Sequence, residues 1–181
     1  EIRNCDWSSD VCSSDLVCKN ITVQLNSSGT ASITASQVDN GSADACGITM
    51  GVSPNSFTCS NVGSNTVVLT VTDSNGNTAT CSSTVTVQDN VAPVATCKNI
   101  TIQLDATGNA SIVAGDINNG SSDACGIALL SASKTSFNCS NVGANTVTLT
   151  VTDNNGNTST CNSTVRSEEH TSELQSQFRI S

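Results

Sequence analysis

The stretch that decides the fold is NTVTLTVTDNNGNTSTC, residues 145–161. Its first half alternates Val and Leu with Thr, so one face of an extended strand is apolar and the other carries hydroxyl groups. Asn-Asn-Gly-Asn follows at residues 154–157, and Asn-Gly between two β-runs favours a tight hairpin, because both central residues need positive φ angles. The period of two, rather than 3.6, predicts a pair of strands.

Nearly the same stretch stands earlier in the chain, as NTVVLTVTDSNGNTATC at residues 65–81. Three shorter segments, CKNIT, DACGI and CSNVG, also occur twice in the same order. The body of the chain is therefore two copies of one unit, with one residue inserted in the second copy between Gly126 and Phe137. VQDNVAPVATC joins the copies, and its Pro93 favours an extended linker.

Each copy contains about seven short runs of strand character separated by turn signals, in roughly 80 residues. This spacing predicts an all-β fold of two tandem immunoglobulin-like β-sandwich modules. No segment combines helix caps with a 3.6-residue period. Phe57 and Phe137 are the expected large core residues of the two copies. Cys97 has the opposite parity to Ile100, so either a bulge intervenes or this Cys points away from the main core.

The two ends of the chain have a different origin from its body. One DNA string that encodes RSEEHTSELQS, residues 166–176, encodes DWSSDVCSSDL, residues 6–16, on its complementary strand, and this string resembles a sequencing-library adapter. We interpret residues 1–16 and 166–181 as adapter-derived and not native. The native body is then repeat one at 17–88, with its first strand missing, and repeat two at 89–165, with its last strand truncated; we expect it to be a fragment of a longer array.

The body, residues 17–165, is acidic and rich in Cys. Three Lys and eight Asp give a net charge of 3 − 8 = −5, and no basic run is present, which argues against a nucleic-acid partner. No stretch approaches the roughly 20 apolar residues of a membrane span. Eight Cys in two small units with weak cores indicate disulfides and hence an extracellular or cell-surface protein.

Four Cys in each copy allow three pairings. We favour the nested one, in which the outer pairs join the first strand to the last and the inner pairs close a short loop: Cys18–Cys81 and Cys97–Cys161 outside, Cys46–Cys59 and Cys125–Cys139 inside. The alternative joins sequence neighbours, such as Cys18 with Cys46. Zinc is disfavoured, because the spacings lack a Cys-x-x-Cys pair and the body has no His.

CKNITIQLD, SSDACGI, the TVTLTVTDNNGNTSTC strand pair and the DNVAP linker resemble the hyalin-repeat (HYR) family, and above all the tandem HYR-like repeats of large bacterial surface and secreted proteins. The resemblance covers residues 17–165. It implies an Ig-like fold, extracellular placement and a role in adhesion or as a stalk. The chain differs from the commoner HYR pattern in having Lys after the first Cys and in the additional CSNVG cysteine.

Catalysis has little support, since nucleophilic triads need a base and the chain's one His, His170, lies in the adapter-derived end. Calcium is the candidate metal, and otherwise no cofactor is expected. Asp89-Asn90 resembles the acidic linkers between tandem extracellular modules, while Asp73 and Asp153 begin loops with alternating oxygen ligands. Turn formation explains the two loops equally well, because Asp favours the backbone hydrogen bonds of turns.

The sequence thus predicts a non-enzymatic extracellular repeat module that acts in cell adhesion or as a stalk. Its partners would be an unidentified surface ligand or glycan and the neighbouring repeats of the same chain. The alternative is an accessory carbohydrate-targeting module of a secreted multidomain enzyme. Few aromatic residues argue against a carbohydrate-stacking surface.

Overall fold

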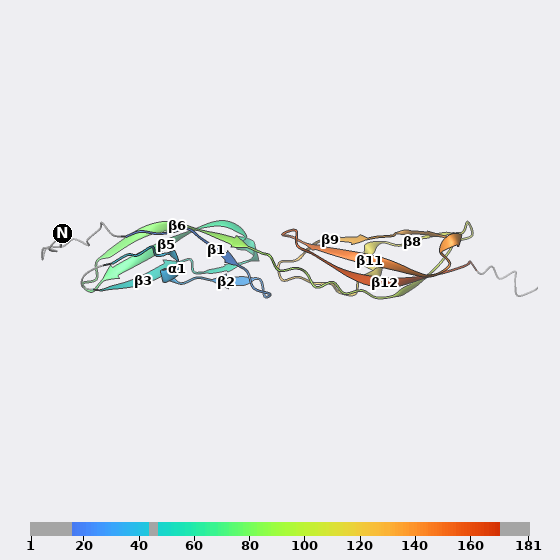
Figure 1. Ribbon diagram of the computed structural model, residues 1–181, viewed down its shortest axis with the longest axis horizontal. Coiled ribbons are helices and arrows are strands. Elements are labelled where there is room, and N and C mark those ends of the chain that lie inside the picture. Colours follow the sequence, from blue (N-terminus) through green and yellow to red (C-terminus); the bar gives the residue numbers. More distant parts are fainter. Residues whose placement is uncertain (1–15, 44–46, 171–181) are drawn as a thin grey trace, which may run out of the picture. The chain divides into compact units, whose positions relative to one another are not determined.

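The computed structural model describes residues 16–43 and 47–170 (Figure 1). The chain divides into two compact units, Glu1–Val91 and Ala92–Ser181, which follow the same order of elements. Each unit is a small β-sandwich, so the predicted all-β fold of two tandem immunoglobulin-like modules is confirmed. Among the described residues, none of the helices has the length and apolar character needed to cross a membrane.

Unit one contains a four-stranded sheet in the order β1-β6-β5-β3 and a two-stranded sheet of β2 and β4. The elements are β1 (Ile21–Gln24), β2 (Thr30–Ser32), α1 (Ala35–Val38), β3 (Ile48–Ser53), β4 (Ser56–Thr58), η1 (Cys59–Asn61), β5 (Gly63–Asp73) and β6 (Thr78–Gln88).

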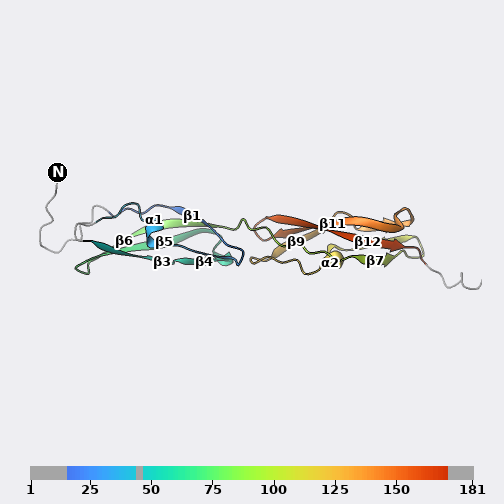
Figure 2. The same ribbon diagram turned by 60° about the horizontal axis from the view of Figure 1, so that its bottom comes forward.

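Unit two repeats this arrangement, with sheets β7-β12-β11-β9 and β10-β8. Its elements are β7 (Ile100–Gln103), β8 (Asn109–Ser111), α2 (Ala114–Ile117), β9 (Ile127–Ala132), β10 (Ser136–Asn138), η2 (Cys139–Asn141), β11 (Gly143–Asp153) and β12 (Thr158–Glu168). Figure 2 shows its long β11–β12 hairpin, in orange and red, from a second side.

The two long hairpins, β5–β6 and β11–β12, form where the alternating pattern predicts them. In β11, Val147, Leu149 and Val151 are fully buried, while the Thr residues between them lie on the outer face. The turn after Asp153 is closed by Gly156, whose φ of +92° is accessible to glycine at little cost. The hairpin is antiparallel along its length, so the apolar face of both strands points to one core.

Each unit has its own core with one aromatic residue. Phe57 is 1% exposed and Phe137 is 2% exposed, as expected from the sequence. In unit two Phe137 packs within a cluster of buried apolar residues from both sheets and α2: Leu104, Ile112, Ile117, Val147, Leu149, Val151 and Val165.

The strand that follows the first Cys of each unit, β1 or β7, pairs with the last strand in parallel. By sequence parity, Cys97 and Ile100 are expected to face opposite sides of this strand. β7 runs parallel to β12, whereas Cys97, three residues earlier, forms an isolated bridge with Asn118, at the end of α2. Cys97 and Ile100 both pack against the core cluster, so this Cys does not point away from the core.

Two features differ from the sequence-based expectation. First, α1 and α2 are single helical turns of four residues, too short to produce a 3.6-residue pattern in the sequence. Second, β12 is as long as β6: it continues past Val165 through Arg166, Ser167 and Glu168, residues that we interpret as adapter-derived. Backbone N–H and C=O groups make the ladder whatever the side chains are, so the strand is not shortened at Val165.

Candidate functional site

One disulfide occupies the same place in each unit. Cys18–Cys81 and Cys97–Cys161 join the segment before the first strand to the last strand, with Cα–Cα distances of 6.1 and 5.8 Å. These are the two outer pairs of the nested pairing. They also rule out the alternative pairing of sequence neighbours, because Cys81 is bonded to Cys18.

The predicted inner pair of unit two is wrong, because the Cys139 thiol is free and exposed. Cys125 lies beside the β11–β12 turn, where its carbonyl accepts a hydrogen bond from Asn154 Nδ2 at 2.6 Å. Cys139 precedes Gly143, at the opposite end of β11. Eleven residues at about 3.3 Å each separate the two ends of this strand by roughly 30 Å, far beyond the reach of a disulfide. The prediction paired Cys125 with Cys139 because they are close in sequence. It did not foresee that the chain between the two residues runs along the length of the unit.

The corresponding pair of unit one, Cys46–Cys59, cannot be compared in the same way. Cys46 lies outside the described residues. Cys59 occupies the place that Cys139 has in unit two: it begins η1, and its sulfur lies 3.7 Å from the carbonyl oxygen of Gly29. The Cys46–Cys59 pairing stays a prediction.

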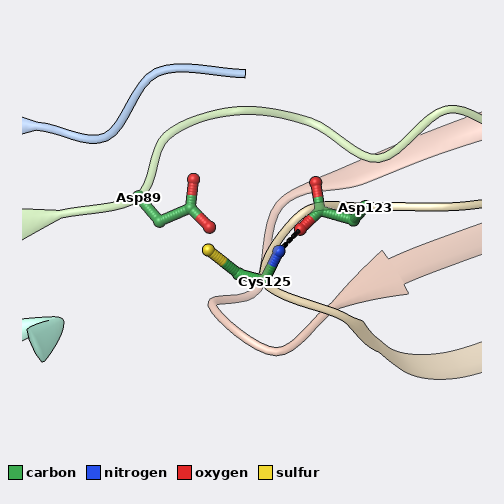
Figure 3. A group of neighbouring side chains, drawn as sticks. All are labelled: Asp89, Asp123 and Cys125. Atoms are coloured by element: carbon green, nitrogen blue, oxygen red, sulfur yellow. Dashed lines mark hydrogen bonds between the residues drawn. The ribbon is translucent and has the colours of Figure 1, made fainter. Parts of the chain in front are cut away.

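The DACG segment of unit two is a turn held by its own side chains. Figure 3 shows the Asp123 carboxylate turned toward the backbone nitrogen of Cys125, from which Oδ1 accepts a hydrogen bond at 2.7 Å. Gly126 follows with a φ of +94°, and a Cβ on it would lie 2.7 Å from Asn154 Nδ2. The positive φ favours glycine here, and a side chain would also displace the Asn154 amide from its hydrogen bond to Cys125. This turn accounts for the DACG motif of unit two; residues 44–46 of the first copy lie outside the described residues.

The two candidate calcium loops are turns in which Asp accepts several hydrogen bonds. Asp153 Oδ1 accepts from the backbone nitrogens of Asn155 (2.9 Å) and Asn157 (2.8 Å), and Oδ2 accepts from Asn157 Nδ2 (2.8 Å). Burial raises the pKa of Asp153, but the Asn157 side chain and the backbone N–H groups of the loop outweigh burial and hold the pKa below its ordinary value.

Asp73 makes the same three contacts in unit one, with the nitrogens of Asn75 and Asn77. The Asn77 amide is the main reason that the pKa of Asp73 is lowered. The loops therefore use their one carboxylate to close the turn, as the turn explanation predicts, whereas calcium prefers six to eight oxygens with several carboxylates. Calcium binding at either loop stays a prediction.

Asp89 and Asn90, the candidate linker ligands, follow β6 at the end of unit one. Asp89 is 7% exposed, and its Oδ1 accepts a hydrogen bond from the backbone nitrogen of Val91 at 3.1 Å. Asn90 Nδ2 donates to Gln24 Oε1 at 2.8 Å. Both side chains thus have roles within unit one, and calcium binding by them also stays a prediction.

Sequence reasoning missed a shallow hollow on the β8–β10 sheet of unit two. Its volume is about 290 Å³, and it is lined by Asp105, Asn109, Ala110, Ser111, Ser136 and Phe137. The Thr107 hydroxyl is the main cause of a lowered pKa at Asp105, whose Oδ1 also accepts from the backbone nitrogens of Thr107 and Asn109. A fixed carboxylate with hydroxyl and amide groups beside it suits a small polyhydroxylated molecule. The sequence gives one signal for this hollow, an Asp in a turn at position 105. Such a residue is common in β-turns and does not by itself indicate a binding site.

No protein-family model matches the chain, and no curated protein matches it. Among solved structures it is similar to human mucin-like protocadherin EC1-2, with 15% identity and a TM-score of 0.40 over 84% of this chain and 97% of that one. The match to protocadherin gamma B7 extracellular cadherin domains 1–4 has 12% identity and a TM-score of 0.38, and covers 86% of this chain and 52% of that one. This chain therefore spans about half the length of that protein.

The Clostridium thermocellum CbhA fibronectin(III)-like modules match with 11% identity and a TM-score of 0.33, over 91% of this chain and 98% of theirs. All these scores are low. The fold assignment rests instead on the sheet order and pairing within each unit. By the sheet order and pairing, each half of the chain is an immunoglobulin-like β-sandwich, and a disulfide joins the segment before its first strand to its last strand.

Proposed function

We propose that the two units are non-enzymatic, HYR-like extracellular repeat modules of a bacterial surface or secreted protein, which act in cell adhesion or as a stalk. The observation that carries this proposal is the disulfide at the same place in both units, Cys18–Cys81 and Cys97–Cys161. Disulfides of this kind persist in oxidising, extracellular surroundings.

The strand order around this disulfide suits a module that bears tension. In unit one, β1 and β6 are parallel neighbours, with Ile21 opposite Val85 and Gln24 opposite Gln88. A pull on the start of β1 and on the end of β6 therefore loads their hydrogen bonds together, in shear. The disulfide adds a covalent limit, since the residues between Cys18 and Cys81 cannot extend while it is intact. Unit two has the same parallel pair, β7 and β12.

Single-molecule stretching of the oxidised and the reduced chain tests the stalk function. With the disulfide intact, the 63-residue separation of Cys18 and Cys81 stays closed, so each unit should release about 220 Å less length on unfolding than after reduction. In a Cys18→Ala, Cys81→Ala variant, unit one should release the same length on unfolding before and after reduction, while unit two should still show the difference. Equal lengths before and after reduction would contradict a load-bearing role for the disulfide.

Four of the Asp carboxylates are poorly suited to act as general acids. The pKa of Asp39, Asp73, Asp105 and Asp153 is lowered in each case, whereas a general acid that works at neutral pH needs a raised pKa. At Asp73 and Asp153 the carboxylate oxygens are used in turns. We infer that these groups maintain loops.

Bacterial origin, the HYR family and a longer array are tested by sequencing the parent gene through both ends of this chain. Further units of about 80 residues and a surface-anchoring segment would support an adhesin or stalk. A catalytic domain beside the repeats would favour the accessory-module function. Adhesion is separated from a pure stalk by presenting the chain at high density on beads and measuring retention on cells and glycan-coated surfaces, where a pure stalk binds nothing.

The hollow at Asp105 favours a second candidate function, carbohydrate targeting within a larger secreted enzyme. Titration of soluble oligosaccharides against the chain, followed by NMR, should then shift the backbone signals of Asn109 and Ser111, which line the hollow. Asp105→Ala should abolish the shifts, and the equivalent change in unit one, Asn26→Ala, serves as a matched control. No shift with any oligosaccharide would remove this candidate.

A further inference from the structure

We propose that consecutive repeats of the array are joined by a disulfide between the CSNVG cysteine of one repeat and the DACG cysteine of the next, which in this chain are Cys59 and Cys125. The inference deepens the stalk function and rests on the tandem array and the oxidising surroundings proposed above. It is an alternative to the Cys46–Cys59 pairing predicted from the sequence. Such a bridge links each repeat to its neighbour covalently at a second point, beside the peptide chain.

Cys125 has its disulfide partner outside unit two. It is disulfide-bonded, but unit two contains only three other cysteines. Cys97 and Cys161 are bonded to each other, and the Cys139 thiol is free. The partner of Cys125 therefore belongs to another repeat.

Cys59 is the counterpart of Cys139 in unit one, and it is disulfide-bonded. In both residues Sγ lies 3.7 Å from the carbonyl oxygen of a turn glycine, so their local structure is the same. Yet Cys59 is half-buried, whereas the free Cys139 is exposed. Cys18 and Cys81 are bonded to each other, which leaves Cys46 or a cysteine outside unit one as the partner of Cys59.

The CSNVG cysteine lies at the end of the unit from which the chain leaves. Cys59 Sγ is close to the carbonyl oxygen of Gly29, in the turn that follows β1. Just before this turn, the backbone nitrogen of Leu25 donates to the carbonyl oxygen of Gln88, the last residue of β6, at 2.9 Å. Cys59, the turn and the end of β6 are therefore together at the exit end of unit one.

The DACG cysteine lies at the opposite end, where the chain enters the unit. Val94, near the start of unit two, exchanges two backbone hydrogen bonds with Ser122, at 2.8 and 3.0 Å. Ser122 directly precedes the turn of Asp123 and Cys125, which is closed by the bond from the Gly126 nitrogen to the Asp123 carbonyl oxygen at 3.3 Å. Cys125 is therefore at the entry end of its unit.

The linker keeps an exit end and the next entry end on a short tether. Residues 89–93 lie between the end of β6 and Val94, and five residues extend to no more than about 18 Å. Groups joined by so short a tether have effective concentrations on the order of millimolar, which favours a bond between them over a bond to another chain. In the proposed array, Cys139 would pair with the DACG cysteine of a following repeat in the same way.

Formation of the bridge is a two-electron oxidation by thiol–disulfide exchange, with a protein disulfide or glutathione disulfide as the oxidant. One cysteine thiolate attacks the oxidant's disulfide, so a mixed disulfide forms and the first oxidant sulfur leaves. The thiolate of the second cysteine then attacks the sulfur of the first, and the second oxidant sulfur leaves. The two thiol protons pass to the oxidant, which is released as two thiols.

The test is peptide mapping of the whole chain after reduction, refolding in a glutathione buffer and alkylation of the free thiols. A protease that cleaves before Asp places Cys59 in peptide 44–72 and Cys125 in peptide 123–152. We expect these two peptides to be linked before reduction and separate after it, with Cys139 alkylated. Refolding a mixture of ¹⁵N-labelled and unlabelled chains identifies any link between chains, since only such a link gives peptide pairs of mixed isotope content.

Two matched pairs of variants identify the linked sulfurs, because each of the two peptides contains a second cysteine. Cys59→Ala and Cys125→Ala should each abolish the link. Cys46→Ala and Cys139→Ala should each retain it. The two outer disulfides, which the same map detects, show that each variant has folded.

A bridge between Cys46 and Cys59 within peptide 44–72, or links found only between chains, would overturn the proposal. The stalk function would remain intact in that case, because the outer disulfides are still formed. Absence of the outer disulfides as well would overturn both, since the proposed placement in oxidising surroundings depends on them. The failure of the inter-repeat bridge is therefore distinguishable from the failure of the proposed function.

Discussion

The two units have the same sheet order and the same strand pairing, but they differ where the last strand ends. Near the end of β6, Val87 lies opposite Gly63 and is 1% exposed. β12 has Ser167 opposite Gly143, equally buried, and its hydroxyl has no hydrogen-bond partner among the described residues. The backbone ladder thus continues through a residue that the core does not favour. This difference agrees with the interpretation that the sequence after Val165 was not selected for this fold.

A second difference lies in the residues over the single aromatic side chain. Lys134 Nζ lies 4.8 Å from the centre of the Phe137 ring, a cation–π contact. Unit one has Pro54 at the corresponding position, after a cis peptide bond with Ser53. Both units have Phe at this core position, but the residue at the position of Lys134 differs between them. The core therefore depends on the aromatic ring and tolerates different residues in the loop beside it.

Truncating the aromatic residue should have the largest effect of any single change. Phe137→Ala leaves a cavity in the cluster of unit two and should cost about 3–5 kcal/mol, enough to unfold so small a domain. Phe57→Ala should do the same to unit one. Denaturant unfolding followed by NMR should show loss of one unit while the other keeps its signals. Phe137→Leu is the control that retains most of the volume, and equal loss of both units in either variant would contradict separate cores.

Removing one disulfide should come next. Cys97 and Cys161 are 64 residues apart, and a bridge over such a loop contributes about 4 kcal/mol in the loop-entropy model. Replacing both with Ala should therefore lower the midpoint of unit two strongly, and Cys18→Ala with Cys81→Ala that of unit one by a similar amount. Calorimetry in the absence of reductant measures both. Cys139→Ala is the matched control and should have a much smaller effect, because Cys139 forms no disulfide.

The end of the last strand offers a stabilising substitution. Ser167→Val replaces a buried, unpartnered hydroxyl with the residue that unit one has at this place, and should stabilise unit two by about 1–2 kcal/mol. Val87→Ser should destabilise unit one by a comparable or larger amount. Thermal melting by circular dichroism compares the pair. If Ser167→Val lowered the midpoint, this residue would not be facing an apolar core.

Acid should weaken both units through their hairpin turns. Because the folded pKa of Asp73 and Asp153 is lowered, their stabilising effect is fully present above the pKa of the unfolded chain, about 3.9, and is lost as pH falls through the folded pKa. The melting midpoints of both units should therefore decrease at pH values below about 4. Asp153→Asn should reduce this dependence in unit two more than Asp73→Asn does in unit one, since Asp153 is 1% exposed. Identical pH profiles in the variants and the parent chain would refute the assignment.

Calcium should have the smallest effect. The carboxylates of Asp73 and Asp153 already accept three hydrogen bonds each, so we expect EDTA to leave both melting midpoints unchanged. A calcium-dependent rise in a midpoint would instead support the calcium prediction. If Asp89→Asn abolished that rise and Asp73→Asn and Asp153→Asn did not, the ligands would lie at Asp89 and Asn90.

Much of the fold could be predicted from local pattern. The alternation in β11, the Asn-Gly turn after Asp153 and the burial of Phe137 are properties of neighbouring residues, and sequence reasoning identified all three. The outer disulfides were favoured from the sequence over a pairing of sequence neighbours, and the structure confirms them. The single-turn helices left no periodic signal, and the hollow at Asp105 depends on β8 pairing with β10 rather than with β7.

The sequence by itself determined the repeat, the β-class, the core aromatic residue and the turns, because each depends on residues close together in the chain. Only the tertiary structure decided which end of a strand each Cys occupies. Cys125 and Cys139 are 14 residues apart in sequence and at opposite ends of β11 in space, because β9 and β10 run between them along the length of the unit. Pairings across a sheet are set by strand order and direction, and sequence separation alone does not encode either.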